Sequence, residues 1–98
     1  MRKPPSFHEL AELELNDAAD FYNSKQAGLG AAFIHAVQQA VVQISELPES
    51  CIAVKGSARR KVLNRFPYNL IYSIALDRIR VLAIASQRRR PFYWRGRA

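Results

Sequence analysis

The chain has 98 residues, of which 49% are hydrophobic, and a formal net charge of +7. This length suits one domain over residues 1–98, and the apolar fraction predicts a packed core and excludes an intrinsically disordered chain. One cysteine and two distant histidines exclude an internal disulfide and a zinc site of the usual spacing, so we expect neither a metal nor another cofactor.

Residues 2–8 predict a short first strand. Pro4 and Pro5 suit the start of a strand or the edge of a sheet, where a missing N–H costs little. Alternatively the first helix begins here, because Ser6 and Glu9 have the spacing of a helix capping box. Both interpretations hold together if the strand is very short.

A helical hairpin is predicted next, over residues 9–25 and 29–46. In both segments the apolar residues recur every three or four positions, so each helix has one apolar face. Gly28 and Gly30 break the pattern and mark the turn between the helices, and Pro48 ends the second helix. A turn this short makes the two helices antiparallel neighbours.

The last third of the chain changes to the two-residue period of β-strands. Residues 49–57 have the composition of a connecting loop, and strands are predicted around 62–66, 68–75 and 79–85, with a hairpin turn over 76–78. The order of strand, helical hairpin and three-stranded meander predicts an α+β fold. In this fold the hairpin packs on one face of a small, mainly antiparallel sheet.

Positive charge is concentrated in the second half of the chain. From Lys55 onward there are twelve lysines or arginines and one acid, and before it three and seven, so the halves carry +11 and −4. Such a surface points to an anionic partner, nucleic acid or an acidic protein; the alternative is a basic face that only keeps the protein soluble. No segment has the pattern of a basic amphipathic helix, a membrane span or a signal peptide, so we expect a cytoplasmic protein without a membrane partner.

Several short motifs follow one another along the chain, and their order is more specific than any one of them. They are Phe7-His8 with Ala11, Glu14-Leu15, Ala18 and Phe21-Tyr22; Gly28-Leu29-Gly30 with Phe33; Arg59-Arg60; Arg65-Phe66-Pro67-Tyr68 with Tyr72; Val81 to Ala85; and Arg88-Arg89-Arg90-Pro91 with Tyr93-Trp94. Together they resemble the RelE/ParE superfamily of small bacterial toxins over essentially the whole chain.

The resemblance implies the toxin of a type II toxin–antitoxin pair, often called a plasmid stabilisation protein, that a cognate antitoxin neutralises. Some members resemble RelE and cut messenger RNA on the ribosome, and others resemble ParE and poison DNA gyrase without a known catalytic step. Many members have a histidine where this chain has Ser86, and serine has no proton to exchange near neutral pH. We therefore favour ParE-like inhibition of DNA gyrase; the alternatives are a metal-independent, RelE-like endoribonuclease and a plain nucleic-acid-binding module.

Two overlapping sets of residues are candidates for the site. Arginine matches the geometry of phosphate groups, so a target protein or RNA would be bound by Arg59, Arg60, Arg65, Arg88, Arg89, Arg90 and Trp94. In an endoribonuclease, Arg65 or Arg88 would stabilise the charge on phosphorus, and Lys61 or Tyr93 would exchange protons if its pKa were shifted by several units. Tyr93 and Trp94 could also stack on bases, but we expect them to hold the tail against the sheet.

Overall fold

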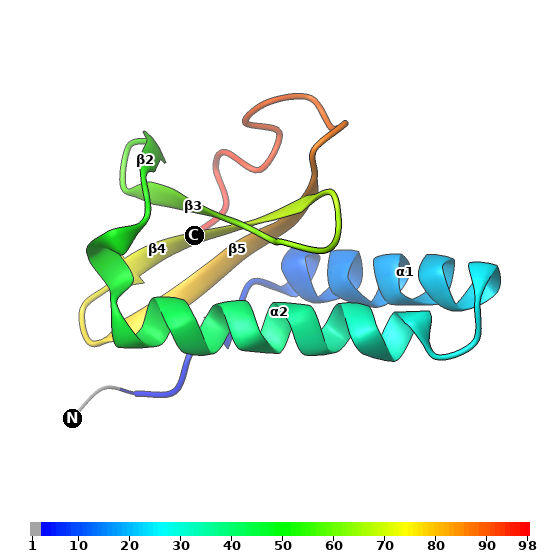
Figure 1. The fold of residues 1–98 in the computed structure, drawn as a ribbon. Coiled ribbons are helices and arrows are strands. Elements are labelled where there is room, and N and C mark those ends of the chain that lie inside the picture. The colour runs from blue at the N-terminus through cyan, green and yellow to red at the C-terminus, as the bar shows by residue number, and fades with distance from the viewer. Residues whose placement is uncertain (1–2) are drawn as a thin grey trace.

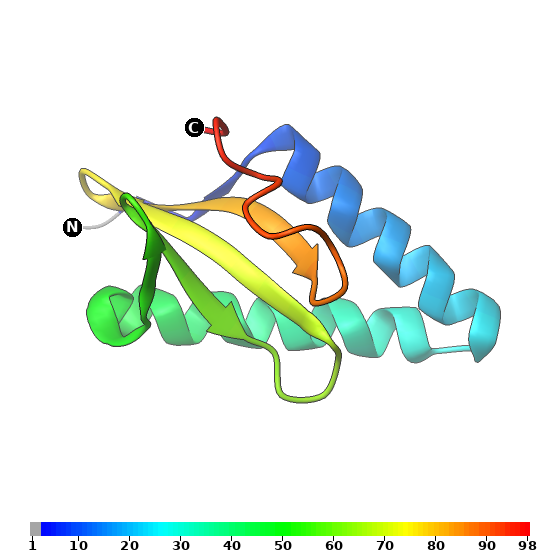
Figure 2. The same ribbon diagram turned by 90° about the horizontal axis from the view of Figure 1, so that it is seen from above.

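Two antiparallel helices pack on one face of a five-stranded sheet, and the C-terminal tail crosses the other face (Figures 1 and 2). The computed structural model describes residues 3–98, so Arg2, the first residue of the predicted strand 2–8, lies outside the described residues. The α+β architecture agrees with the sequence prediction. None of the helices within residues 3–98 is long and apolar enough to span a membrane.

The chain order follows the prediction, with one additional short helix and one additional strand. The elements are β1 (Ser6–Phe7), α1 (Glu9–Lys25), α2 (Leu29–Glu46), the 3-10 helix η1 (Pro48–Ser50), β2 (Ala53–Lys55), β3 (Ala58–Val62), β4 (Tyr68–Ala75) and β5 (Arg78–Ser86). The order of strands in the sheet is β1-β5-β4-β3-β2. β1 is parallel to β5 and every other pair is antiparallel, so the sheet is mainly antiparallel as expected.

The loop predicted over 49–57 is wrong in part, because it contains the last two residues of η1 and all of β2. β2 is only three residues long, and its pairing with β3 is irregular between Ala53 and Lys55. Its side chains alternate, with Val54 half-buried between exposed Ala53 and Lys55, but three residues are too few for a period to be recognised in the sequence.

The strand predicted over 62–66 is also misplaced, since β3 ends at Val62. Leu63 and Phe66 are both buried, but the chain turns between them, and the Leu63 N–H donates to the Tyr68 carbonyl (3.0 Å). Two buried residues three positions apart belong to a loop folded over the core and not to the two-residue alternation of a strand.

The start of α1 resolves the two interpretations of residues 2–8. Ser6 lies in β1, where it is paired with Arg80 of β5, and is not a helix cap. Instead His8 caps α1, because its Nδ1 accepts a hydrogen bond from the Leu10 N–H (3.1 Å). The short strand is therefore present, and the helix follows it directly.

The helical hairpin meets the sheet through a continuous apolar core. The buried residues of this core come from both helices and from the central strands: Ala11, Ala18, Ala19, Phe33, Val37, Ala40, Ile44, Leu70, Tyr72, Ile79, Val81 and Ile84. At one end the rings of Tyr22, Phe33, Phe66 and Tyr68 pack edge to face, with centroids about 5 to 6 Å apart. The core fixes the helices on one sheet face and leaves the other face to the tail.

Gly28 and Gly30 have different roles, although the sequence assigns both to the turn. Gly28 precedes α2 with a φ of +87°, a left-handed conformation that glycine adopts without strain. Gly30 lies inside α2, and its N–H donates to Asn23 Oδ1 (2.8 Å). A Cβ at Gly30 would overlap the Ala19 carbonyl oxygen and lie 2.7 Å from Asn23 Cγ, so this glycine permits the close approach of the two helices.

Tyr72 connects the centre of the sheet to η1. Its side chain is fully buried, and its hydroxyl donates a hydrogen bond of 2.6 Å to the Pro48 carbonyl. Burial raises the pKa of Tyr72 above its usual value, and the neighbouring Cys51 thiol adds to the shift.

This raised pKa predicts a loss of stability in alkali. A group that binds its proton more tightly in the folded state stabilises that state fully below the unfolded pKa, here about 10, and the contribution is lost as the pH rises above it. We expect the free energy of unfolding to fall above about pH 10, and to fall less in Tyr72→Phe, as measured by urea unfolding over a pH series. Parallel curves for the two proteins would contradict this expectation.

Candidate functional site

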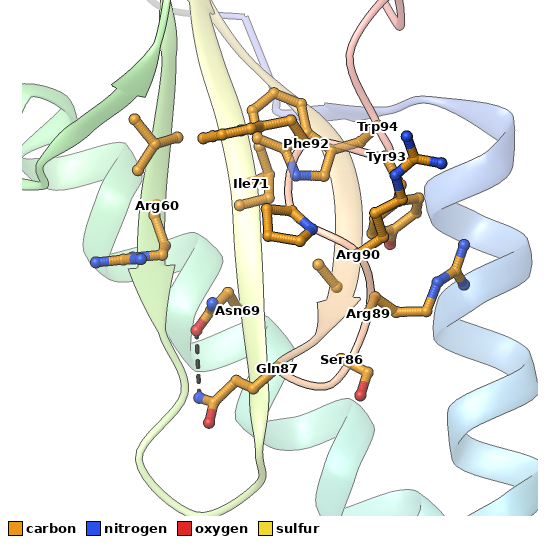
Figure 3. Close-up of a pocket in the computed structure, with 13 residues that line it drawn as sticks. Arg60, Asn69, Ile71, Ser86, Gln87, Arg89, Arg90, Phe92, Tyr93 and Trp94 are labelled. Atoms are coloured by element: carbon orange, nitrogen blue, oxygen red, sulfur yellow. Dashed lines mark hydrogen bonds between the residues drawn. The ribbon is translucent and has the colours of Figure 1, made fainter.

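A groove of about 220 Å³ lies between the C-terminal tail and the sheet face turned away from the helices (Figure 3). Arg60 of β3 and Asn69 and Ile71 of β4 line one side of it. The end of β5 and the tail form the other side, through Ser86, Gln87, Arg89, Arg90, Pro91, Phe92, Tyr93 and Trp94. We call these residues the cationic groove.

The register of the sheet explains why Arg60 lies on the face of the sheet that the tail crosses. Arg60 is paired with Ile71, and paired residues on neighbouring strands share a face of the sheet. Ile71 packs with Trp94 of the tail and not with the helical core. Arg60 therefore lies on the same face as the tail.

The groove is cationic, although one of its arginines, Arg89, also lines a neighbouring hollow with Glu14 and Asp17. Arg60, Arg89 and Arg90 are exposed, and none of the residues that line the groove is an aspartate or glutamate. Lys55 lies nearby, with its Nζ 5.1 Å from the centroid of the Phe92 ring. None of the three groove arginines takes part in an ion pair within residues 3–98. These cations are thus available to a bound anion.

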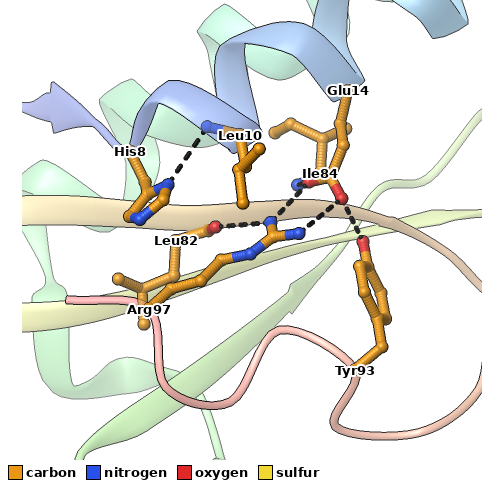
Figure 4. Close-up of polar contacts among 7 residues, drawn as sticks. All are labelled: His8, Leu10, Glu14, Leu82, Ile84, Tyr93 and Arg97. Atoms are coloured by element: carbon orange, nitrogen blue, oxygen red, sulfur yellow. Dashed lines mark hydrogen bonds and ion pairs between the residues drawn. The ribbon is translucent and has the colours of Figure 1, made fainter.

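The tail is held in place by Trp94 and by a polar network centred on Glu14 (Figure 4). Trp94 is 6% exposed and packs on an apolar cluster on this face of the sheet. Glu14 of α1 accepts a hydrogen bond from the Tyr93 hydroxyl (2.8 Å) and two from the Arg97 guanidinium (2.9 and 3.1 Å). Trp94 therefore anchors the tail, as expected, and its buried ring is not a free stacking surface.

Glu14 also provides a hydrogen-bond acceptor for the backbone at the edge of β5. The register between β4 and β5 changes at Leu82, which forms a bulge, and β1 pairs with β5 only as far as Val81. Beyond that point the Ile84 N–H donates to Glu14 Oε1 (3.1 Å), and the Leu82 carbonyl accepts from Arg97 (3.0 Å). One ion pair thus both closes the strand edge and fixes the tail.

Glu14 was not among the residues predicted for the site. A signal was present, because Glu14 lies three residues after Ala11 and four before Ala18, on the side of α1 that carries the buried alanines. An acid at that spacing is placed towards the sheet and needs a partner there. The identity of that partner, 83 positions along the chain, could not be read from the local pattern.

Tyr93 is held as a hydrogen-bond donor at neutral pH. Burial raises its pKa, and so do the hydrogen bond to Glu14 and the negative charge of this carboxylate. Arg89, whose guanidinium carbon lies 3.9 Å from the centroid of the Tyr93 ring, acts in the opposite direction without reversing the shift. A general base near neutrality needs a lowered pKa, so the shift is in the unfavourable direction for that role.

Lys61 and Arg59 lie away from the groove. Lys61 is paired with Leu70, a residue of the helical core, which places Lys61 on the opposite face of the sheet from Arg60. Arg59 donates hydrogen bonds to the carbonyls of Cys51 (2.7 Å) and Glu49 (3.3 Å), so it holds the segment before β2.

Arg65 and Arg88 are exposed and do not line the groove. Arg65 lies in the loop between β3 and β4, with its guanidinium carbon 5.6 Å from the Phe66 ring centroid. Arg88 follows β5, and its N–H donates to the Ser86 hydroxyl (3.2 Å). Of the predicted site residues, the groove brings together Arg60, Arg89, Arg90, Tyr93 and Trp94.

The groove also contains polar and aromatic residues that were not predicted as site residues. Gln87 Nε2 donates to Asn69 Oδ1 (3.3 Å), which joins the two sides. Phe92 is 38% exposed and has a φ of +61°. In the described part of the chain, no group of three or more His, Cys, Asp or Glu side chains is placed to hold a metal ion.

Comparison with known proteins gives a family and a fold. The family model for the ParE toxin of the type II toxin–antitoxin system parDE matches residues 6–91. Nine chains of solved structures match. One of them, from a chromosomal ParDE toxin–antitoxin system of P. aeruginosa, has a TM-score of 0.65 and 20% identity, and the match covers 88% of this chain and 96% of that chain. No curated protein matches the chain.

Proposed function

Because the chain belongs to the ParE toxin family of type II toxin–antitoxin systems, we propose that it inhibits DNA gyrase by binding and not by a catalytic step. A cognate antitoxin would hold it inactive, and residues 1–98 would act as a single toxin domain. The cationic groove is the surface that we assign to the target.

The chemistry of the groove carries this proposal. The charged residues that line the groove are Arg60, Arg89 and Arg90. Their guanidinium groups bind anions without exchanging protons. Tyr93, which also lines the groove, donates a hydrogen bond from its hydroxyl to Glu14, and its pKa is raised. Ser86 also lines the groove, and a serine hydroxyl does not exchange its proton near neutral pH. Such a set favours tight binding over acid–base catalysis.

A RelE-like, ribosome-dependent endoribonuclease is less well supported. Its two candidate proton-exchanging residues are Lys61 and Tyr93. Lys61 shares a face with the helical core, whereas Tyr93 lies on the tail side of the sheet. RNA cleavage requires an acid and a base on the two sides of one phosphate, and this placement separates them.

A supercoiling assay with purified gyrase tests the proposal. We expect the wild-type protein to inhibit supercoiling and to accumulate cleaved DNA. The double variant Arg60→Glu/Arg89→Glu should lose at least about tenfold in potency, because each charge-assisted hydrogen bond contributes roughly 1.5 to 3 kcal/mol. Arg95→Glu is the matched control, since Arg95 is an exposed arginine of the same tail that does not line the groove.

A different outcome of these assays would refute gyrase as the target. Cleavage of mRNA in a translation reaction, with gyrase unaffected at the same toxin concentration, would refute gyrase as the target. In cells, induction without the antitoxin should stop DNA synthesis before protein synthesis. Circular dichroism of each variant separates loss of function from loss of folding.

A further inference from the structure

We infer that the cationic groove binds the sugar–phosphate backbone of a nucleic acid strand, so that the toxin contacts the DNA held by gyrase as well as the enzyme. The inference rests on the proposed function for the identity of the strand as DNA. The binding chemistry itself comes from the groove.

The cations are placed on both sides of the groove. Arg60 lies on β3 at one side of the groove, and Arg89 and Arg90 lie on the tail at the other side (Figure 3). Each guanidinium can bind two oxygens of one phosphate in a bidentate manner. The lining residues of the groove include no carboxylate, although Arg89 also borders a neighbouring hollow that Glu14 and Asp17 line.

One of these arginines is already held in position. The guanidinium carbon of Arg89 lies 3.9 Å from the Tyr93 ring centroid, and the Tyr93 hydroxyl is fixed by Glu14 (2.8 Å). A side chain that is ordered before binding loses less conformational entropy when the ligand arrives. The Glu14 network therefore prepares the groove for an anion, although Glu14 does not line it.

The groove also has an uncharged polar surface. Asn69 and Gln87 form one hydrogen bond with each other, which leaves the Asn69 amide N–H groups and the Gln87 carbonyl for a ligand. Ser86 adds a hydroxyl on the same surface. Serine, asparagine and glutamine are common partners of phosphate and sugar oxygens in protein–DNA complexes.

Phe92 supplies an aromatic ring beside these polar groups. Its φ of +61° is strained for a bulky residue, yet the residue is 38% exposed. Trp94 contacts the ring edge to face, with centroids 5.9 Å apart, and keeps it at this place. An exposed aromatic ring beside a cationic groove is the arrangement on which unpaired bases stack. Stacking on this ring distinguishes a nucleic acid from a purely anionic peptide such as polyglutamate.

The size of the groove favours a strand over an enclosed small molecule. Its volume of about 220 Å³ is below the roughly 300 to 1,000 Å³ of pockets that enclose drug-sized ligands. We therefore expect the backbone to run along the groove, with one base at Phe92.

Fluorescence anisotropy with a short labelled oligothymidylate, over a series of salt concentrations, tests this inference. Arg60→Ala/Arg89→Ala should weaken binding at least about tenfold and reduce the slope of log K against log salt by about 1 for each phosphate contact removed. Phe92→Leu should weaken binding about fivefold or more and leave the slope unchanged, because stacking carries no net charge. Arg95→Ala is the control and should bind nearly as the wild type does.

Two results would overturn the inference. One is an equal loss of binding in Arg95→Ala, which would mean that net charge alone attracts the oligonucleotide. The other is competition by polyglutamate at the same charge concentration together with no effect of Phe92→Leu, which would assign the groove to an acidic protein segment.

The supercoiling assay separates this inference from the proposed function. If the groove variants lose oligonucleotide binding but still inhibit gyrase, the toxin acts through protein contacts, so the inference fails and the function stands. If the wild type binds the oligonucleotide specifically without inhibiting gyrase, the groove is assigned correctly and the proposed target is wrong.

Discussion

Replacing Glu14 by alanine is expected to destabilise the protein by about 4 kcal/mol, because it removes one partner of a largely buried ion pair. The side chains of Arg97 and Glu14 are only 13% and 16% exposed. Without the carboxylate, Arg97 keeps the Leu82 carbonyl as its remaining partner, and the Ile84 N–H and the Tyr93 hydroxyl lose their acceptor. The free energy of unfolding in urea measures the effect.

One control for this prediction changes another acid of α1, and two others change Glu14 or its ion-pair partner Arg97. Glu12→Ala removes an exposed acid of α1 and should change the stability by less than about 0.5 kcal/mol. Glu14→Gln keeps a side-chain acceptor but loses the charge, so we expect an intermediate value. Arg97→Met in the Glu14→Ala background should recover part of the loss, since it removes the uncompensated cation. A Glu14→Ala protein within about 1 kcal/mol of the wild type would contradict the anchoring of the tail.

The second large effect is expected at Gly30, where alanine should cost about 3 kcal/mol. The new Cβ would overlap the Ala19 carbonyl oxygen, and backbone atoms cannot rotate away as a flexible side chain can. The helices would have to separate, and the 2.8 Å hydrogen bond from the Gly30 N–H to Asn23 would weaken. Thermal and urea unfolding both measure the loss.

Gly28→Asn is the matched control for Gly30. Gly28 has a left-handed φ, but a Cβ added there would meet no atom within 4 Å, and asparagine tolerates this conformation better than other residues. We expect a cost below about 1 kcal/mol. If Gly28→Asn were the more damaging change, the turn and not the helix contact would be the sensitive feature of the hairpin.

The helices and the β4–β5 hairpin could be predicted because each repeats a local pattern over many residues. β2 could not, because its alternation extends over only three residues, which is too short to be told from a loop in the sequence. The placement of Leu63 and Phe66 depends on how a loop folds over the core, which is a long-range property. The Glu14–Arg97 pair joins residues 83 positions apart, and Arg97 lies beyond the part of the chain that the family model matches.

The sequence predicts that the candidate site is rich in arginine and lysine, but it does not predict which of these side chains lie together. Arg59, Arg60 and Lys61 are consecutive residues of β3, so their side chains alternate between the two faces of the sheet. A register one residue different would bring Arg59 and Lys61 to the tail and turn Arg60 towards the helices. The sequence shows the cluster of cations, but only the pairing of β3 with β4 shows which of them reaches the groove.

The bulge at Leu82 and the side chains that cover it affect how readily the sheet could aggregate through its edges. A long, unsatisfied strand edge is a template on which further chains add and aggregate. Here the outer edge of β5 is occupied first by β1 and then by Glu14 and Arg97, and the opposite edge of the sheet is the short, irregular β2. This sheet therefore offers little free edge on which an aggregate could grow.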